Sequence, residues 1–140
     1  MIVLDTNVLS ALMRPDLNAP VVAWLDAQPA ESVWTAAVCV FEVHHGLKRL
    51  PAGRRRAALE AAFDAMLAED LAGRVLPLDA AAALEAGRLA AELEAMGRSV
   101  EMRDVLIAGT VRARHATLAT RNARHFADAG IAVVDPWDAA

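Results

Sequence analysis

Met1-Ile2-Val3-Leu4-Asp5-Thr6-Asn7 is the stretch that decides the fold. Its first four residues are apolar without alternation, which is typical of a short strand buried on both faces of a parallel sheet. Asp5 then falls at the carboxyl end of that strand, and open α/β sheets bind their ligands at this edge. The apolar run starts at residue 1, so we expect no targeting segment before it. The partners of Asp5 are expected after other strands.

The composition is that of one globular domain. The chain has 140 residues, of which 56% are apolar, and a chain of this length buries roughly 70% of its unfolded surface. No apolar run approaches the ~18 residues that a membrane-spanning helix needs. Cys39 is the single cysteine, which excludes an intrachain disulfide and favours the cytoplasm as compartment. The net charge of −4 does not indicate a nucleic-acid binder, although a local basic patch is compatible with it.

Strands and helices alternate along the chain. After the first strand, further strands are predicted at 32–35, 74–78, 116–119 and 131–134. Helices are predicted at 7–13, 21–28, 36–50, 54–71, 80–96 and 103–114, with a short helical turn within 122–129. Asn18 and Asp79 are the expected N-caps, and Gly97 occupies the position after a helix end. The pattern predicts an α/β fold, a three-layer α/β/α sandwich with a parallel sheet of four to five strands, in a single domain over residues 1–140.

Three carboxylates depart from the solvated helix faces that hold most of the others. Asp5 ends a buried strand, Glu42 lies early in the helix after the second strand, and Asp104 opens an apolar helix. In a parallel sheet all three map to one edge. Buried carboxylates that gather repel one another unless a cation joins them, and oxygen ligands favour Mg²⁺ or Mn²⁺. Such an ion activates water for phosphodiester hydrolysis.

Each acid also has an ordinary structural explanation. Asp5 can simply cap the following helix, Glu42 can be a partly exposed or salt-bridged helix residue, and Asp104 suits the positive end of a helix dipole. The conjunction of three at corresponding strand ends favours a site. Asn122, just after the fourth strand, either orients a metal-bound water or caps a turn, and the adjacent Arg121 can meet a phosphate, as can Arg124.

In these stretches the chain resembles the PIN-domain ribonucleases, and among them the VapC toxins, especially the FitB-like branch. The matching stretches are 2–8, 41–43, 104–108 and 120–122 with Phe126, in order along nearly the whole chain. The resemblance implies a PIN-like fold with Asp5, Glu42 and Asp104 around Mg²⁺ or Mn²⁺. Many members carry a fourth acid where this chain has Asn122, a difference that argues against a second tightly held metal.

The resemblance further implies a metal-dependent endoribonuclease toxin. Structured RNA such as transfer RNA is the implied substrate, cut at a metal held by Asp5 and Asp104 with Glu42 and Asn122 nearby. A cognate antitoxin of the VapB or FitA kind is implied as partner, with a peptide in the acidic groove, and a homodimer as the working unit. The apolar stretches 21–25 and 59–67 are candidates for these contacts, and core burial explains them equally well.

Other features of the sequence give weaker evidence about function. His44 and His45 are adjacent and point to different helix faces, so zinc is disfavoured. The basic run formed by Lys48, Arg49 and residues 54–56 is either a solvated corner, which is favoured, or an RNA-backbone contact. Phosphate-binding glycine loops are absent from the sequence, which disfavours nucleotide hydrolysis and NAD binding.

Two other functions remain possible from the sequence alone. The first is a non-catalytic module of the same fold that docks an antitoxin on DNA, and Asn122 gives it some support. The second is a phosphatase with Asp5 as nucleophile, which ranks last because such enzymes usually carry a second Asp two residues on, where this chain has Asn7.

Overall fold

The computed structural model describes residues 1–138 and contains one sheet in which all strands run parallel. Its five strands are ordered β3-β2-β1-β4-β5. Their bounds are β1 Ile2–Leu4, β2 Val33–Ala36, β3 Val75–Leu76, β4 Thr117–Ala119 and β5 Ala132–Val134. The parallel sheet predicted from sequence is confirmed, with β1 at its centre. Of the predicted domain 1–140, residues 139–140 lie outside the described part.

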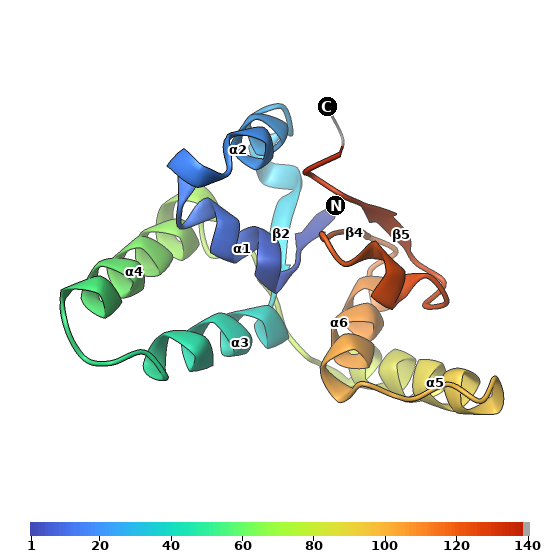
Figure 1. Ribbon diagram of the computed structural model, residues 1–140. Helices are drawn as coiled ribbons and strands as arrows, with labels where there is room; N and C mark the ends of the chain where they lie inside the picture. The colour runs from blue at the N-terminus through green and yellow to red at the C-terminus, as the bar shows by residue number, and fades with distance from the viewer. Residues whose placement is uncertain (139–140) are drawn as a thin grey trace.

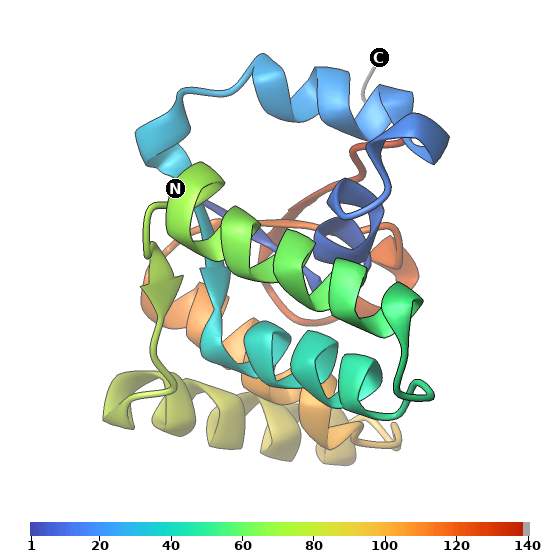
Figure 2. The same cartoon turned by 90° about the vertical axis from the view of Figure 1, so that its left-hand side faces the viewer.

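The helices cover both faces of this sheet. Helices α1 (Thr6–Leu12), α2 (Ala19–Asp26) and α4 (Arg54–Ala65) lie on one side, and α5 (Ala80–Ala95) and α6 (Met102–Ala113) on the other (Figure 1). Helix α3 (Ala37–Lys48) leaves the carboxyl end of β2 and runs beyond the sheet edge, below α4 in Figure 2. The chain moves outward from β1 through β2 to β3 and then returns to β4 and β5, so each parallel connection crosses a face of the sheet. The predicted three-layer sandwich is confirmed.

Helix α5 follows the expected capping chemistry at both ends. Asp79 accepts a hydrogen bond from the Ala82 N–H at 3.0 Å, and Gly97 adopts φ 72° after the end of α5. Asn18 does otherwise: it makes no side-chain cap for α2, and its amide donates to the carbonyls of Ala11 and Arg14. Asn18 therefore occupies the predicted N-cap position of α2, where its carbonyl oxygen accepts the N–H groups of Val21 and Val22, but its side chain bonds back to the end of α1 instead of capping α2.

The core lies on both faces of β1, where Val3 and Leu4 are completely buried. The apolar stretches 21–25 and 59–67 contribute to this core, since Val21 and Phe63 are buried. Large exposed apolar side chains gather instead beside the start of α6, at Phe41, Leu78 and Met102. Among residues 1–138, no helix combines the length and hydropathy needed to cross a membrane.

Candidate functional site

Asp5 is a buried carboxylate held by donors from three directions. The side chain is 5% exposed at the junction of β1 and α1. Its Oδ1 accepts the Thr6 N–H at 2.7 Å and its Oδ2 accepts the Thr120 hydroxyl at 2.7 Å. The Cys39 thiol lies 3.9 Å from Oδ1, and burial, with the Asp5 charge second, raises the pKa of that thiol to about 12. Asp5 therefore both caps α1 and presents a fixed carboxylate to the edge of the sheet.

A small polar network fixes the loop after β4 against the start of α1. Thr120 is completely buried, and its hydroxyl also accepts hydrogen bonds from the Asn7 amide and the Asn122 N–H, both at 3.1 Å. The side-chain Oδ1 of Asn7 in turn accepts the backbone N–H of Arg121 at 3.1 Å. Two segments far apart in sequence thus converge on Asp5.

Glu42 reaches the same edge from α3. Its side chain is 11% exposed, and Oε2 pairs with the Arg103 Nε at 3.0 Å. Its Oε1 is buried without a hydrogen-bond partner, as is the Thr6 hydroxyl. Burial raises the pKa of Glu42, and the negative charges of Asp5 and Asp104 add to that rise. The positive charge of Arg103 opposes this rise in the pKa of Glu42.

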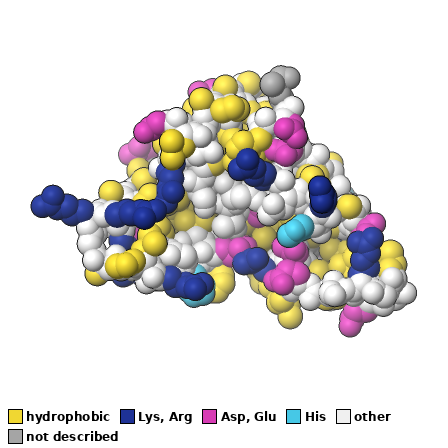
Figure 3. Space-filling model, viewed as in Figure 1, with side chains coloured by type: hydrophobic (Ala, Val, Ile, Leu, Met, Phe, Trp, Pro, Cys, Tyr) yellow, Lys and Arg dark blue, Asp and Glu magenta, His cyan; other side chains and the backbone are white. Residues whose placement is uncertain are grey.

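Asp104 lies in the first turn of α6, on the opposite side of the edge from Glu42. Its Oδ2 is 3.6 Å from the His125 Nδ1, and its side chain is 22% exposed. Burial raises the pKa of Asp104, with further increases from Glu101 and Asp5, while His125 and Arg103 oppose it. Acidic, basic and histidine side chains meet in the hollow between α3 and α6 (Figure 3).

The donor set at this edge fits a hard divalent cation. Carboxylates that are buried near one another, and a buried Glu42 Oε1 with no partner, are the environment that such an ion stabilises. In the part of the chain that the structure describes, however, no three His, Cys, Asp or Glu side chains stand close enough to form a complete metal-binding group. Glu42 pairs with Arg103 instead, and Asp104 lies beside His125.

Asn122 lies next to this network with an exposed side chain. It precedes the 3-10 helix Ala123–Phe126, and its side chain makes no capping hydrogen bond there. Only its backbone N–H joins the network, through Thr120. Asn122 therefore occupies the N-cap position of this turn without a side-chain cap, and a catalytic role for Asn122 stays a prediction.

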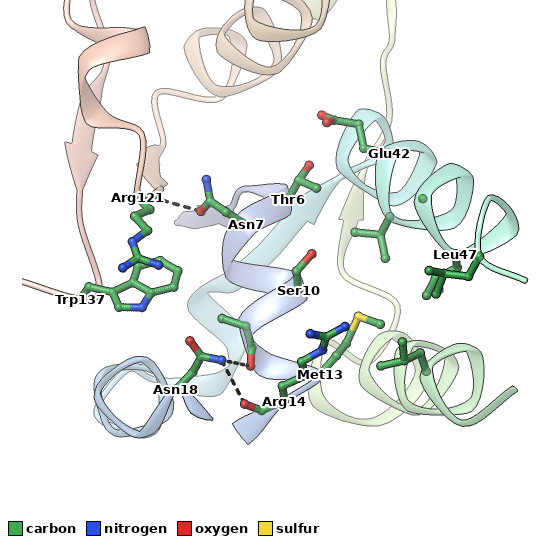
Figure 4. Close-up of a pocket in the computed structure, with 15 residues that line it drawn as sticks. Thr6, Asn7, Ser10, Met13, Arg14, Asn18, Glu42, Leu47, Arg121 and Trp137 are labelled. Atoms are coloured by element: carbon green, nitrogen blue, oxygen red, sulfur yellow. Dashed lines mark hydrogen bonds between the residues drawn. The ribbon is translucent and has the colours of Figure 1, made fainter. Parts of the chain in front are cut away.

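A groove extends from the acidic edge across the exposed side of α1 (Figure 4). Its volume is about 550 Å³, and Thr6, Asn7 and Glu42 line it where it meets the site. Arg14 lines it further along α1, and Arg121 stands over the Trp137 ring at 4.7 Å from the ring centroid. Arg124 lines a separate, smaller cavity behind Asp104.

Sequence reasoning missed several contributors. Thr120 directly follows β4, but its contact with Asp5 depends on the register between two strands that are not consecutive in the chain. Arg103 and His125 were not assigned to the acids they contact. A signal for Arg103 existed, since a positive charge directly precedes Asp104.

Comparison with known proteins places these residues in a family context. The family model described as PIN domain matches residues 2–132. A protein named VapC ribonuclease Y4jK, from Sinorhizobium fredii, is 38% identical over 140 residues, which are 100% of both chains. Toxin FitB from Neisseria gonorrhoeae is 35% identical over 137 residues, covering 98% of this chain and 99% of FitB.

A solved structure of FitAB bound to a DNA fragment contains a chain of the same fold. It aligns with a TM-score of 0.88 at 35% identity, covering 98% of this chain and 96% of that one. The similarity therefore extends over the whole fold and includes both segments that converge on Asp5.

Proposed function

Because the chain belongs to the PIN-domain family, we propose that it is a metal-dependent endoribonuclease and the toxin of a toxin–antitoxin pair. One observation carries the proposal: two carboxyl groups with raised pKa, Glu42 and Asp104, flank the fixed carboxylate of Asp5 at the ligand edge of a parallel sheet. The names of the relatives agree with this chemistry, and structured RNA such as transfer RNA is the substrate class we propose.

Asp5 and Asp104 would hold the ion, Mg²⁺ or its substitute Mn²⁺, with Glu42 either a ligand or the acceptor of a bound water. The ion would supply a Lewis acid and a water of lowered pKa. The protein supplies the rest: Thr120 and the Thr6 N–H fix the orientation of Asp5, at 2.7 Å each. We assign Asn122 the role of orienting substrate or water, as an uncharged amide at the rim.

Arg103 and His125 have a defined part in this scheme. Each places a nitrogen beside one of the acids, at 3.0 Å from Glu42 and 3.6 Å from Asp104. They reduce the repulsion among the carboxylates while no metal is bound. Arg103 is half exposed, so it can leave Glu42 when a divalent ion supplies a stronger charge.

A cognate antitoxin and a second copy of the chain are the proposed partners. The relative FitB is named a toxin, and the FitAB complex binds DNA. An antitoxin peptide that carries an Arg would find at Glu42 a carboxylate that already accepts a guanidinium from Arg103. The exposed apolar patch of Phe41, Leu78 and Met102 is the proposed face for the second copy.

RNA cleavage in the presence of Mg²⁺ tests the proposed activity. Asp5→Asn keeps the shape of the side chain and removes its charge, and should abolish cleavage. Asp64→Asn, at an exposed position on α4, is the matched control and should cleave as the wild type does. Equal cleavage by wild type and Asp5→Asn would contradict the nuclease, and absence of cleavage by the wild type would favour the antitoxin-docking module.

A further inference from the structure

We propose that an RNA strand leaves the acidic site along the groove over α1, with its phosphates held by Arg121 and Arg14. This inference rests on the proposed ribonuclease function and specifies where that substrate lies. The groove is continuous with the site, because Thr6, Asn7 and Glu42 line its inner end. It provides the single-stranded path that a nuclease needs on one side of the cut.

The charged side chains that line the groove are mostly positive, although the net charge of the whole chain is negative. The whole chain carries −4, yet the charged residues lining the groove are two arginines and, at the acidic edge, Glu42. Among residues 1–138, no carboxylate forms an ion pair with Arg14 or Arg121, whereas Arg103 and Arg112 pair with acids. Two uncompensated guanidinium groups beside a carboxylate site favour a polyanion there, and guanidinium donors match phosphate oxygens.

Arg121 is held in place at both ends. Its backbone N–H donates to the side-chain Oδ1 of Asn7 at 3.1 Å, within the network that holds Asp5. Its guanidinium stands over the ring of Trp137. Trp137 packs against the core, and its backbone N–H donates to the Asp135 carboxylate at 2.9 Å. A group that is already oriented loses less conformational entropy when it binds a phosphate. Trp137 is thus a positioning residue, acting through Arg121.

RNA binding without cleavage tests the path directly. The probe is a single-stranded RNA of about 12 nucleotides, titrated against the full chain in EDTA and followed by fluorescence anisotropy. Arg121→Gln and Arg14→Gln should each raise Kd roughly tenfold at low salt, as the loss of one charge-assisted contact. Each should also reduce the slope of log K against log salt by about 0.7, the share of one phosphate on a single strand.

The matched control is Arg88→Gln. It removes the same charge from an exposed position on α5, away from the groove, and should leave Kd and the salt slope at wild-type values. Trp137→Leu should weaken binding as Arg121→Gln does, the double variant should lose nothing more, and Trp137→Phe should restore part of the affinity. Unchanged melting temperatures identify these effects as local.

The possible outcomes separate the two proposals. If Arg121→Gln and Arg14→Gln bind RNA as Arg88→Gln does, the RNA path is overturned, even when the wild type cleaves RNA with Mg²⁺. In that case a protein ligand would be the remaining candidate for the groove. If the two variants weaken binding and the wild type cleaves nothing, the path stands as a binding site and the nuclease assignment fails.

Discussion

The Thr120 hydroxyl is the polar group that ties the two halves of the site together. It donates to Asp5 at 2.7 Å and accepts from Asn7 and Asn122. Thr120→Val is nearly isosteric and leaves the buried Asp5 oxygen short of one donor. Supporting residues of this kind typically change activity about 10–100-fold, so we expect Mg²⁺-dependent cleavage to fall by that factor. Urea unfolding should show a loss of about 1–2 kcal/mol.

Thr110→Val is the control for that substitution. Thr110 is also buried, and its hydroxyl donates at 2.8 Å to the Leu106 carbonyl within α6, away from the acids. The Thr110→Val protein should be less stable than the wild type and should cleave RNA as fast as the wild type. If Thr110→Val and Thr120→Val lose equal amounts of activity, Thr120 has no specific role in the site.

The raised pKa values of Glu42 and Asp104 predict how stability depends on pH without metal. Their folded-state pKa values lie above the ordinary 4.5 and 3.8, so the folded chain binds protons more readily than the unfolded chain. Stability from these groups is present below the ordinary values and is lost as pH rises through the folded pKa. The double variant Glu42→Gln/Asp104→Asn should therefore be more stable than wild type at pH 7.5 in EDTA.

Two further conditions check this prediction. The stability difference should shrink toward pH 4, where the wild-type carboxyl groups become protonated. Adding Mg²⁺ should raise the melting temperature of the wild type and leave the double variant unchanged. If the wild type is more stable than the double variant at pH 7.5 in EDTA, the prediction is wrong. Arg103 and His125 would then stabilise the two carboxylates by more than their burial destabilises them.

At the scale of elements, α5 and α6 pack closely because Gly109 lacks a side chain. A Cβ at Gly109 would lie 2.6 Å from the Ala82 carbonyl oxygen and from Ala86. Gly109→Ala should therefore push α6 away from α5 and destabilise the fold by about 1–3 kcal/mol in urea unfolding.

Gly87→Ala is the counterpart in the same helix pair. A Cβ there meets nothing within 4 Å, and the change should stabilise the fold by roughly 0.5–1 kcal/mol through helix propensity. If both substitutions destabilise the fold to a similar extent, the close packing of α5 on α6 does not explain why position 109 needs a glycine.

Local sequence patterns predict elements well and side-chain partners poorly. The cap at Asp79 and the left-handed Gly97 depend on neighbours within one turn, so both were predictable. The N-cap position of Asn18 was predictable, but the direction of its side chain was not, because the carbonyls of Ala11 and Arg14 that it meets depend on how α2 folds back on α1. The Glu42–Arg103 pair joins α3 to α6, and only the packed fold brings them together.

At the scale of the whole molecule, the exposed apolar patch predicts self-association. Phe41, Leu78 and Met102 are 65%, 41% and 67% exposed and lie together beside the acidic edge. Met102→Glu should convert a dimer into a monomer of 14.9 kDa in light scattering. Leu84→Glu is the matched control: Leu84 is 70% exposed on α5, outside this patch, and its substitution should leave the dimer intact.

The layered fold was predictable because alternating strands and helices give a parallel sheet with helices on both faces. The placement of Asp5, Glu42 and Asp104 at one sheet edge follows from the same rule. What the rule does not give is side-chain direction. The structure turns Glu42 to Arg103 and Asp104 to His125, while Asp5 stays fixed by Thr120.

A crystal structure with Mn²⁺, located by its anomalous signal, tests the central claim most directly. We predict one ion about 2.1 Å from oxygens of Asp5 and Asp104, with Glu42 released from Arg103 to ligate the ion or one of its waters. An Mn²⁺-soaked crystal in which no ion contacts Asp5, and in which Arg103 still holds Glu42, would contradict the account.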